Sequence, residues 1–432
     1  MSDHGATLTD LPADGEIVDV SKFSKIIRVS GFVGLLTLVA SLGIIFFGGH
    51  SELGKTFSYS WLFACYFFFT IAVGGLFWVL LHNVSNSGWG VAIRRIMEHL
   101  SNMLPYVFIL FIPILFLQDP SEALYEWMLK LRIADENGVE PEYLLKNKAP
   151  YLTMGFFYFR FFAYAVSLSG IAWLMRRWSV GQDKTGDIRP TFWARRASAG
   201  FVPVFAVCST FMAFDLLMGL DWTWFSTMWG VYIFAGSALS SMAVMILTIT
   251  FLRSRGYMKK VVTLEHYHIM GKFMFAFTVF WAYISFSQFF LYWYANVTEE
   301  TKFYIIRNTE GWHYLSIFLV FGHFVMPFAF LLRQKAKKDM RQICGAACWV
   351  LLVHFIDIYW IIMPERGPSI TQYLELYPAG AQITIPYGII FDIFAFVSVG
   401  SIMLWAYLRS MGNYSIYPSR DPRLLESARL VN

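Results

Sequence analysis

Long apolar segments alternate with short polar ones along most of the chain. A helix needs about 20 mostly apolar residues to cross the hydrocarbon core of a bilayer, and ten segments of this kind are present. They are residues 25–48, 57–81, 100–117, 151–176, 197–218, 224–252, 264–294, 311–333, 341–363 and 386–409. No alternation of period two, which a strand would require, competes with them. The pattern therefore predicts an all-α polytopic membrane protein with ten transmembrane helices.

The composition narrows the class of protein further. Of the 432 residues, 57% are apolar and 15% are charged, whereas a soluble domain has about 25% charged residues. This difference excludes a soluble fold, a disordered chain and a disulfide scaffold. The net charge of +5 does not indicate nucleic-acid binding, because the basic residues lie between the apolar segments rather than on one face.

Lys and Arg residues are distributed unevenly between the two sides of the predicted membrane. Of the 34 such residues, 24 lie on the side of both termini and 8 lie on the opposite side, while Arg160 and Lys272 fall within spans. The positive-inside rule then predicts that both termini are cytoplasmic. Acidic residues precede the first apolar segment where a signal peptide would have basic ones, so we expect a polar tail there.

Spans two to five resemble spans six to nine in a series of ordered matches. The matched positions are Phe57–Trp61 with Phe225–Trp229, Glu98–His99 with Glu265–His266, Arg160–Phe161 with His323–Phe324, and Asp215 with Asp357. An even number of spans separates the two copies, so both run in the same direction through the membrane. The repeat predicts two four-helix bundles, spans two to five and spans six to nine, flanked by spans one and ten.

The predicted organisation follows from the spans and the repeat. Its parts are a cytoplasmic polar tail (1–24), the first span with its outer turn (25–56), bundle one (57–223), bundle two (224–363), an outer loop with the tenth span (364–409) and a basic cytoplasmic tail (410–432).

The longest outer connection, 118–150, opens with signals for a helix start. Asp119, Pro120 and Glu122 suit the N-cap, N1 and N3 positions, and Ala123–Leu131 alternates apolar and polar residues at helical spacing. A short surface helix is therefore expected. It either lies on the bilayer or docks an extrinsic partner, and the sequence leaves both interpretations open.

Ionisable residues inside the spans are the candidate functional residues, because each costs roughly 2.5–3.5 kcal/mol to place at mid-membrane. The outer half is expected to hold Arg160, Asp215, His323, His354, Asp357 and Asp392. The inner half is expected to hold Glu98, His99, Glu265, His268 and Lys272. One interpretation is a gated proton path, with a connected outer relay centred on Asp357 and His354. The other is that Arg160–Asp215 and His323–Asp357 are static ion pairs that lock the two bundles.

Sequence motifs for redox cofactors and nucleotides are absent. There is no Cys-x-x-Cys-His for covalent haem, no Cys cluster for iron–sulfur, and no Walker or Rossmann fingerprint. The four Cys residues are interpreted as small packing residues. We therefore expect no catalytic residue, no metal and no cofactor bound by this chain itself, with quinone, quinol or lipid as candidate ligands and an unknown quinone site.

Several segments carry a family resemblance. They are Phe77–His82 through Gly88–Trp89 to Arg94–Arg95, Asp215–Leu216 through Gly219 to Asp221–Trp222, Glu265–Tyr267 to Gly271–Lys272, and Trp281 to Gln288 with Tyr292–Tyr294. Over roughly residues 20–410 the chain resembles the NrfD-type (polysulfide-reductase) membrane subunits. It is most similar to the ActF-type subunit, or quinone-binding subunit 2, of bacterial alternative complex III, a quinol:cytochrome c oxidoreductase.

The resemblance implies a location in the bacterial inner membrane and a set of partners. These are a larger NrfD-type sister subunit, an iron–sulfur subunit, multihaem and monohaem cytochrome c subunits, a terminal oxidase and membrane lipid, with no nucleic acid. In this family a redox-active quinol site is expected near the outer surface of the first bundle, formed by a His and an acidic residue. Here span three has only His99, at its inner end, and span four has Arg160 in place of a carboxylate. We therefore expect a proton-conducting subunit without its own redox centre; the alternatives are a proton-coupled secondary transporter or a quinol-binding subunit in its own right.

Overall fold

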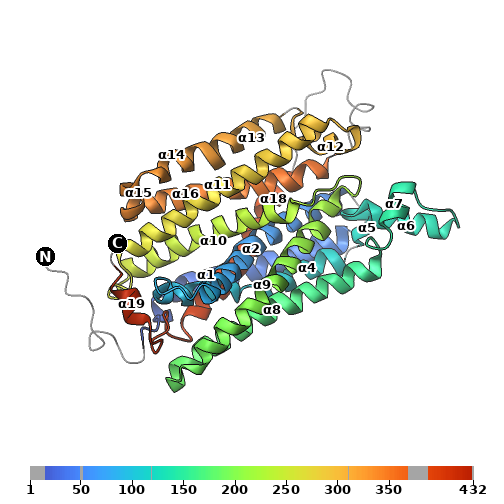
Figure 1. Ribbon diagram of the computed structural model, residues 1–432. Coiled ribbons are helices and arrows are strands. Elements are labelled where there is room, and N and C mark those ends of the chain that lie inside the picture. Colours follow the sequence, from blue (N-terminus) through green and yellow to red (C-terminus); the bar gives the residue numbers. More distant parts are fainter. Residues whose placement is uncertain (1–14, 49–51, 118, 310, 368–387, 431–432) are drawn as a thin grey trace.

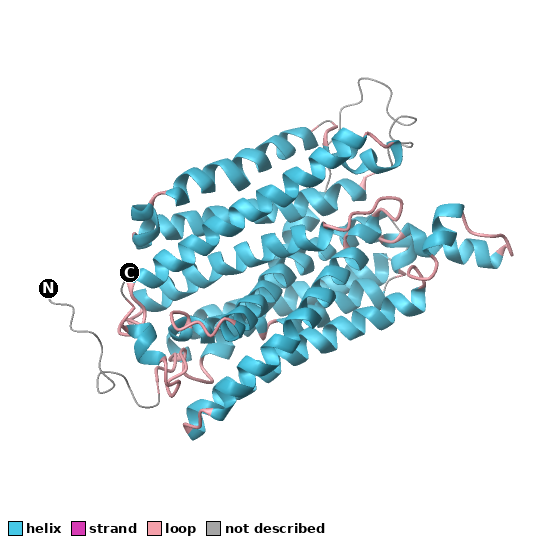
Figure 2. Cartoon of the chain, viewed as in Figure 1, coloured by secondary structure: helices cyan, strands magenta, loops and turns pink. Residues whose placement is uncertain are grey.

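The computed structural model describes residues 15–48, 52–117, 119–309, 311–367 and 388–430 (Figure 1). Ten helical segments in these ranges are long and apolar enough to cross a membrane, and Figure 2 shows helices joined by loops, with no strand in the part described. The predicted fold class is thus confirmed. The first 14 residues of the expected polar tail and residues 368–387 of the expected outer loop lie outside the described ranges.

The spans correspond to helices or to pairs of helices. They are α1 (Ser24–Gly48), α2 (Glu52–Val84), α3 (Arg94–Ser101) with α4 (Leu104–Ile112), α8 (Met154–Thr185), α9 (Arg189–Leu216), α10 (Trp229–Ser254), α11 (Leu264–Ala295), α13 (Trp312–Leu319) with α14 (Met326–Leu332), α16 (Met340–Ile362) and α18 (Gly388–Met411). Short helices connect or extend them: η2 (Val20–Phe23), η3 (Val91–Ile93), η4 (Pro113–Leu117), α5 (Pro120–Ala123), α6 (Glu126–Glu136), α7 (Tyr143–Lys148), η5 (Met218–Leu220), α12 (Thr298–Arg307), η6 (Val320–Val325), α15 (Gln334–Lys338), η7 (Met363–Arg366) and α19 (Leu424–Ala428).

Two of these helices extend well past the predicted ends of their spans. The expected end of span four was residue 176 and the expected start of span five was residue 197, but α8 continues to Thr185 and α9 begins at Arg189. The reason is that hydropathy marks where the hydrocarbon ends, not where the helix ends. Arg and Lys are good helix formers, so the charged ends of both helices continue beyond the bilayer on the basic side.

Helices α2 and α10 form the centre of the molecule. Within their most apolar windows 78% of α2 and 72% of α10 is buried, against 22% for α1. The two helices approach closely at Gly74, where an added Cβ would lie 2.1 Å from the Ser237 carbonyl oxygen. Beside this point the Trp78 indole donates to the Ala238 carbonyl, 3.1 Å away. The small residues in these segments therefore serve close helix packing.

The remaining spans pack around this central pair in two groups. Helices α3, α4, α8 and α9 pack with α2. Helices α11 and α16 pack with α10, and on their far side α13 packs with α16 and α14 packs with both α11 and α16. We call these groups bundle one and bundle two, as in the sequence-based expectation. Helices α1 and α18 pack against each other and against α2, outside both bundles. Figure 1 shows α10 between the helices of the two bundles.

Span eight contains a turn of π-helix. η6, Val320–Val325, is a π-helix between α13 and α14, and such turns are rare and occur frequently at functional sites. Its Gly322 carbonyl accepts a hydrogen bond from the indole of Trp349 on α16, at 2.8 Å. Both Gly322 and His323 are buried, so this turn presents His323 to the interior of bundle two.

The end of bundle one opposite to the described ends of the chain, which we call the outer end, carries the helices α5, α6 and α7, and Figure 1 shows α6 and α7 projecting beyond the spans. Asp119 caps α5 as predicted, accepting from the Ser121 backbone at 2.9 Å. The single expected helix over 123–131 is wrong in its bounds, because the chain leaves helical geometry at Leu124 and α6 starts at Glu126. Partial burial raises the pKa of Asp119, but hydrogen bonds from Ser121 and the Arg132 guanidinium outweigh it, so that pKa lies below its ordinary value.

Segments from opposite ends of the chain close the end of the molecule at which both described ends of the chain lie, which we call the inner end. Ile17 pairs with Ser415, and the Glu16 carboxylate accepts from the backbone N–H of Met258, 2.6 Å away. The hydroxyl of Ser427 donates to the Trp89 carbonyl at 2.6 Å. The loops that follow α2 and α10 are thus joined by the terminal segments, and both described ends lie at the same end of the bundle (Figure 1).

Candidate functional site

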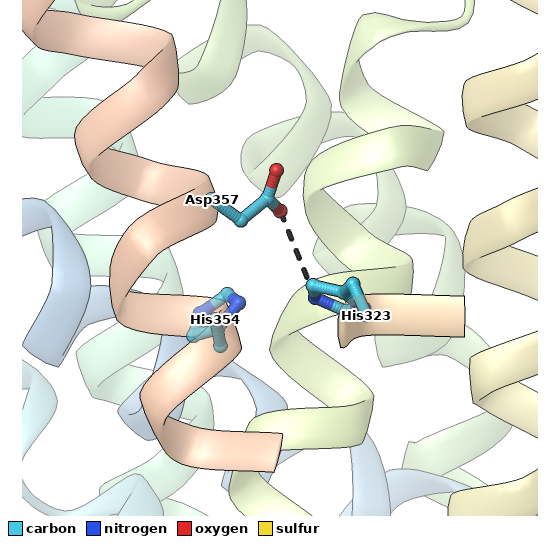
Figure 3. A group of neighbouring side chains, drawn as sticks. All are labelled: His323, His354 and Asp357. Atoms are coloured by element: carbon cyan, nitrogen blue, oxygen red, sulfur yellow. Dashed lines mark ion pairs between the residues drawn. The ribbon is translucent and has the colours of Figure 1, made fainter. Parts of the chain in front are cut away.

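Three ionisable side chains meet inside bundle two. His354 and Asp357 lie one turn apart on α16, and His323 faces them from the π-helix η6 (Figure 3). We call this group the triad. Its three residues are at most 1% exposed, and one potential ligand atom from each residue lies within 4.8 Å of the others.

Asp357 accepts hydrogen bonds on both carboxylate oxygens. The Tyr232 hydroxyl donates to one oxygen, and the Trp281 indole donates to the other at 3.1 Å. His323 Nε2 lies 3.9 Å from that second oxygen, too far for a hydrogen bond. The Trp281 ring also stacks on the His323 ring, with centroids 3.7 Å apart. Trp281 therefore fixes the plane of His323 while leaving its nitrogens free.

The hydrogen bonds of His354 determine which of its nitrogens carries the proton. His354 Nε2 lies 2.8 Å from the Thr70 hydroxyl, and that hydroxyl is also 2.6 Å from the Phe67 carbonyl. Since a carbonyl can only accept, Thr70 donates its single proton to Phe67 and accepts from His354 Nε2–H. In the neutral ring, His354 Nδ1 then carries a lone pair. Gly236 leaves room for the ring, because an added Cβ there would lie 3.0 Å from His354.

Three imidazole nitrogens of the triad have no hydrogen-bond partner among the described residues. They are both ring nitrogens of His323 and Nδ1 of His354. A buried polar group without a partner costs about 1–3 kcal/mol, so side chains that serve only to pack would not favour this arrangement. The triad can therefore accept a proton or another cation without breaking an existing bond.

Bundle one contains a buried ion pair that, unlike the triad, has a partner for every polar atom. The Arg160 guanidinium donates to both Asp215 oxygens, at 2.7 and 2.8 Å, and the hydroxyls of Tyr151 and Tyr164 each donate to Asp215 at 2.8 Å. A third Arg160 nitrogen donates to the Tyr151 carbonyl. Every polar atom of the ion pair is thus engaged, and the static interpretation fits this pair.

Asp392 belongs to a third group on α18. It accepts from the Ser60 hydroxyl at 2.5 Å, from Arg366 at 2.7 Å and from the Tyr359 hydroxyl at 2.8 Å. Within the described ranges no hydrogen bond links Asp392 or Asp215 to Asp357. The six residues expected to form one connected outer relay are therefore placed in three separate groups. Along their helices, His323 and His354 lie near the middle of the spans Trp312–Leu332 and Met340–Arg366.

The expected inner residues divide into two sets. At the inner end of bundle two, Glu265 accepts from Lys338 and lies 3.3 Å from His268 Nδ1. Lys272, one turn further along α11, is exposed.

The second inner set lies in bundle one. Glu98 pairs with Arg95 at 3.0 Å, and His99 Nδ1 lies 2.9 Å from the Ser410 hydroxyl and 3.1 Å from Arg176. Across the residues described, no hydrogen bond connects either inner set to the triad.

A large apolar cavity lies next to the triad. Its volume is about 680 Å³, and helices α10, α11, α12, α13, η6 and α16 contribute to its wall. Tyr232 and Trp281, which both bond to Asp357, form part of that wall. Other lining side chains, such as Phe286 and Val320, are more than half exposed on the outer surface of the helices. The cavity therefore connects the surface that faces lipid with the residues that hold Asp357.

Sequence reasoning missed the residues that orient the triad, namely Thr70, Tyr232 and Trp281. A hydroxyl or an indole N–H inside a span needs a hydrogen-bond partner, so each could have been flagged as a partner of a buried ionisable group. Their spacing along the chain gave no indication of which partner each one has.

Comparison with known proteins found no family model that matches the chain and no curated protein with significant sequence similarity to it.

Proposed function

We propose that this chain is a membrane subunit of a respiratory quinol:cytochrome c oxidoreductase of the alternative complex III type, with no redox centre of its own, and that it conducts protons through bundle two. Its resemblance to NrfD-type subunits supports the membership in such a complex. The excess of Lys and Arg on the side of the termini supports an orientation in the bacterial inner membrane with both termini cytoplasmic.

The triad is the observation that carries proton conduction. Its two imidazoles lie near the middle of their spans and its carboxylate lies one turn further along α16. All three groups are buried, and three imidazole nitrogens have no partner within the described residues. Imidazole and carboxylate groups are the side chains that most readily exchange protons near neutral pH. The Arg160–Asp215 ion pair differs from the triad in this respect, because all of its donors and acceptors already form hydrogen bonds.

A proton would pass through the triad by short steps. Asp357 Oδ2 and His323 Nε2 are 3.9 Å apart, a separation that a small side-chain rotation or one bridging water would close. The Glu265–His268 contact at the basic end of α11 is the candidate inner half of the path. The interval between that contact and the triad would interrupt the path and prevent a proton leak. A conformational change transmitted from the larger NrfD-type sister subunit would bridge this interval and let protons pass.

Membership in a complex is tested by purification in mild detergent followed by mass spectrometry of the accompanying chains. We expect the sister subunit, the iron–sulfur subunit and the multihaem and monohaem cytochromes to accompany this chain. The helices α5, α6 and α7 project beyond the spans on the outer side and offer a surface to such extrinsic chains. A chain that purifies alone would refute membership.

Proton conduction is tested with Asp357→Asn in membrane vesicles in which quinol oxidation drives proton translocation. Asparagine keeps the shape of the side chain and removes its titratable proton, so proton translocation should fall at least tenfold while electron transfer continues. Asp357→Glu should restore most of the translocation. Tyr359→Phe is the matched control, because Tyr359 is two residues away on α16 but bonds to Asp392 instead of the triad. Normal translocation by an assembled Asp357→Asn variant would refute the proposal.

The cavity beside Tyr232 and Trp281 favours a second function, quinol binding by this chain itself. Its apolar and aromatic wall suits an isoprenoid-type ligand that enters from lipid, and the two wall residues lead to a proton acceptor at Asp357. Ala282→Trp would fill part of this cavity without touching the triad bonds. Quinol oxidation that weakens with this variant would support the second function, and unchanged quinol kinetics would exclude it.

A further inference from the structure

The donor atoms of the triad form the set that a zinc ion prefers. We propose that His323, His354 and Asp357 bind one Zn²⁺ ion, which blocks the proton path by occupying the same lone pairs. The blocking step rests on the proposed function, whereas the binding step stands on the geometry alone.

The spacing of the donors on two helices matches a metal site. His354 and Asp357 are three residues apart, so they project from the same face of α16. Pairs of this spacing, combined with a ligand from a facing helix, are used for metal sites in helical bundles. Two ligands of one tetrahedral zinc ion lie about 3.3 Å apart, given bonds of about 2.0–2.1 Å. The triad atoms, all within 4.8 Å of one another, reach this spacing by side-chain rotation.

The surrounding hydrogen bonds orient the donors as a metal site requires. Ligating His residues usually donate their second ring N–H to an oxygen acceptor, which fixes the tautomer. His354 does this through Nε2 and Thr70, and its Nδ1 lone pair is left for the ion. Tyr232 and Trp281 hold the Asp357 carboxylate in the same way.

Charge also favours a cation at this position. Within the described residues no Lys or Arg pairs with Asp357, whereas Asp215 pairs with Arg160 and Asp392 pairs with Arg366. A divalent ion with one carboxylate and one hydroxide ligand is neutral overall, and zinc lowers the pKa of a bound water to about 7. An ion in the triad therefore need not leave a net charge in the interior of the bundle.

Binding is tested on tag-free protein, purified with its accompanying chains, dialysed against a zinc buffer and analysed for metal by mass spectrometry. Wild-type protein should retain one equivalent of zinc more than the His323→Gln, His354→Gln or Asp357→Asn variant. Zinc X-ray absorption of the wild type should show two imidazole ligands for the added equivalent. A wild type that retains no more zinc than these variants, or a spectrum of that equivalent without imidazole, would overturn the proposal.

Two further variants keep the test decisive if a triad variant folds poorly. Thr70→Val removes the acceptor of His354 Nε2–H without touching a ligand, and we expect about 10- to 100-fold weaker zinc binding, the usual effect of losing such a partner. Thr70→Ser should restore binding. His268→Gln is the matched control, because His268 also contacts a carboxylate, that of Glu265, at 3.3 Å. Equal binding by Thr70→Val and wild type, or a loss with His268→Gln equal to that of the triad variants, would refute the site.

The same vesicles separate failure of the zinc site from failure of the proposed function. Zinc should inhibit proton translocation by the wild type, whereas His268→Gln serves as a control for zinc binding alone. If zinc binds the triad but Asp357→Asn translocates protons normally, the zinc site stands and the proton path is refuted. If translocation depends on Asp357 but the wild type retains no additional zinc, the proton path stands and the zinc site is refuted.

Discussion

Replacing Arg160 by Gln should destabilise the protein far more than the equivalent replacement of His323. Arg160→Gln removes two charged hydrogen bonds to Asp215 and leaves that buried carboxylate with only the hydroxyls of Tyr151 and Tyr164. Breaking one partner of a buried ion pair costs about 3–5 kcal/mol. A loss of about 4 kcal/mol reduces the folding equilibrium constant by a factor of about 10³. His323→Gln loses no hydrogen bond to Asp357 and gives up mainly its ring contact with Trp281, worth about 0.5–1.5 kcal/mol.

The comparison can be made by reversible unfolding in mixed micelles with an increasing fraction of denaturing detergent. A double-mutant cycle with Asp215→Asn isolates the interaction between the two residues. The double variant should lose at least about 2 kcal/mol less unfolding free energy than the sum of the losses in the two single variants. Coupling energies of residues in contact are roughly 0.5–3 kcal/mol. A cost below about 1 kcal/mol for Arg160→Gln, or strict additivity in the cycle, would refute the assignment of Arg160–Asp215 as a static pair.

Two other predictions concern regions away from the triad. Because the pKa of Asp119 is below its ordinary value in the folded chain, its contribution to stability is present above the unfolded pKa and is lost as the pH falls through the folded pKa. Hydrogen exchange of α5 and α6 should therefore accelerate at acid pH in the wild type, and much less so in Asp119→Asn; equal acceleration in both would contradict the assignment. Gly74→Ala places a methyl group 2.1 Å from the Ser237 carbonyl oxygen, so it should lower stability by about 1–3 kcal/mol through overpacking. In Gly170→Ala nothing lies within 4 Å of the new methyl group, so thermal unfolding in detergent should show no loss of stability, and similar losses in both would contradict the close approach of α2 and α10.

The fold could be predicted from the sequence because it depends mainly on the length of the apolar segments. An apolar segment of about 20 residues has few alternatives to a spanning helix. In the structure, all ten predicted segments form helices that are long and apolar enough to span a membrane. The ends of the helices were less predictable, as α8 and α9 show. Hydropathy reports where the hydrocarbon ends, whereas Arg and Lys are good helix formers and allow a helix to extend past that limit. The break at Leu124 depends on local backbone geometry that no periodicity reveals.

The candidate site was predictable only in its ionisable members. The cost of burying His323, His354 and Asp357 singled them out, and the helical spacing placed the last two on one face of α16. Which residues complete the groups depends on how helices pack across the bundle. Thr70 on α2 reaches His354, and Arg366 rather than a triad residue reaches Asp392. Those pairings join positions more than 20 to nearly 300 residues apart in sequence, and no local pattern encodes them.

The joined terminal segments have a consequence for how the protein is made. Ser415 and Ser427, which bond to the segments near Ile17 and Trp89, leave the ribosome only after the last span. Until then the inner ends of α2 and α10 lack this connection, although both helices have already been inserted. The connection between these loops and the terminal segments therefore forms late in biosynthesis, and a chain released early would leave this end of the helices exposed to the proteases that remove incomplete membrane proteins.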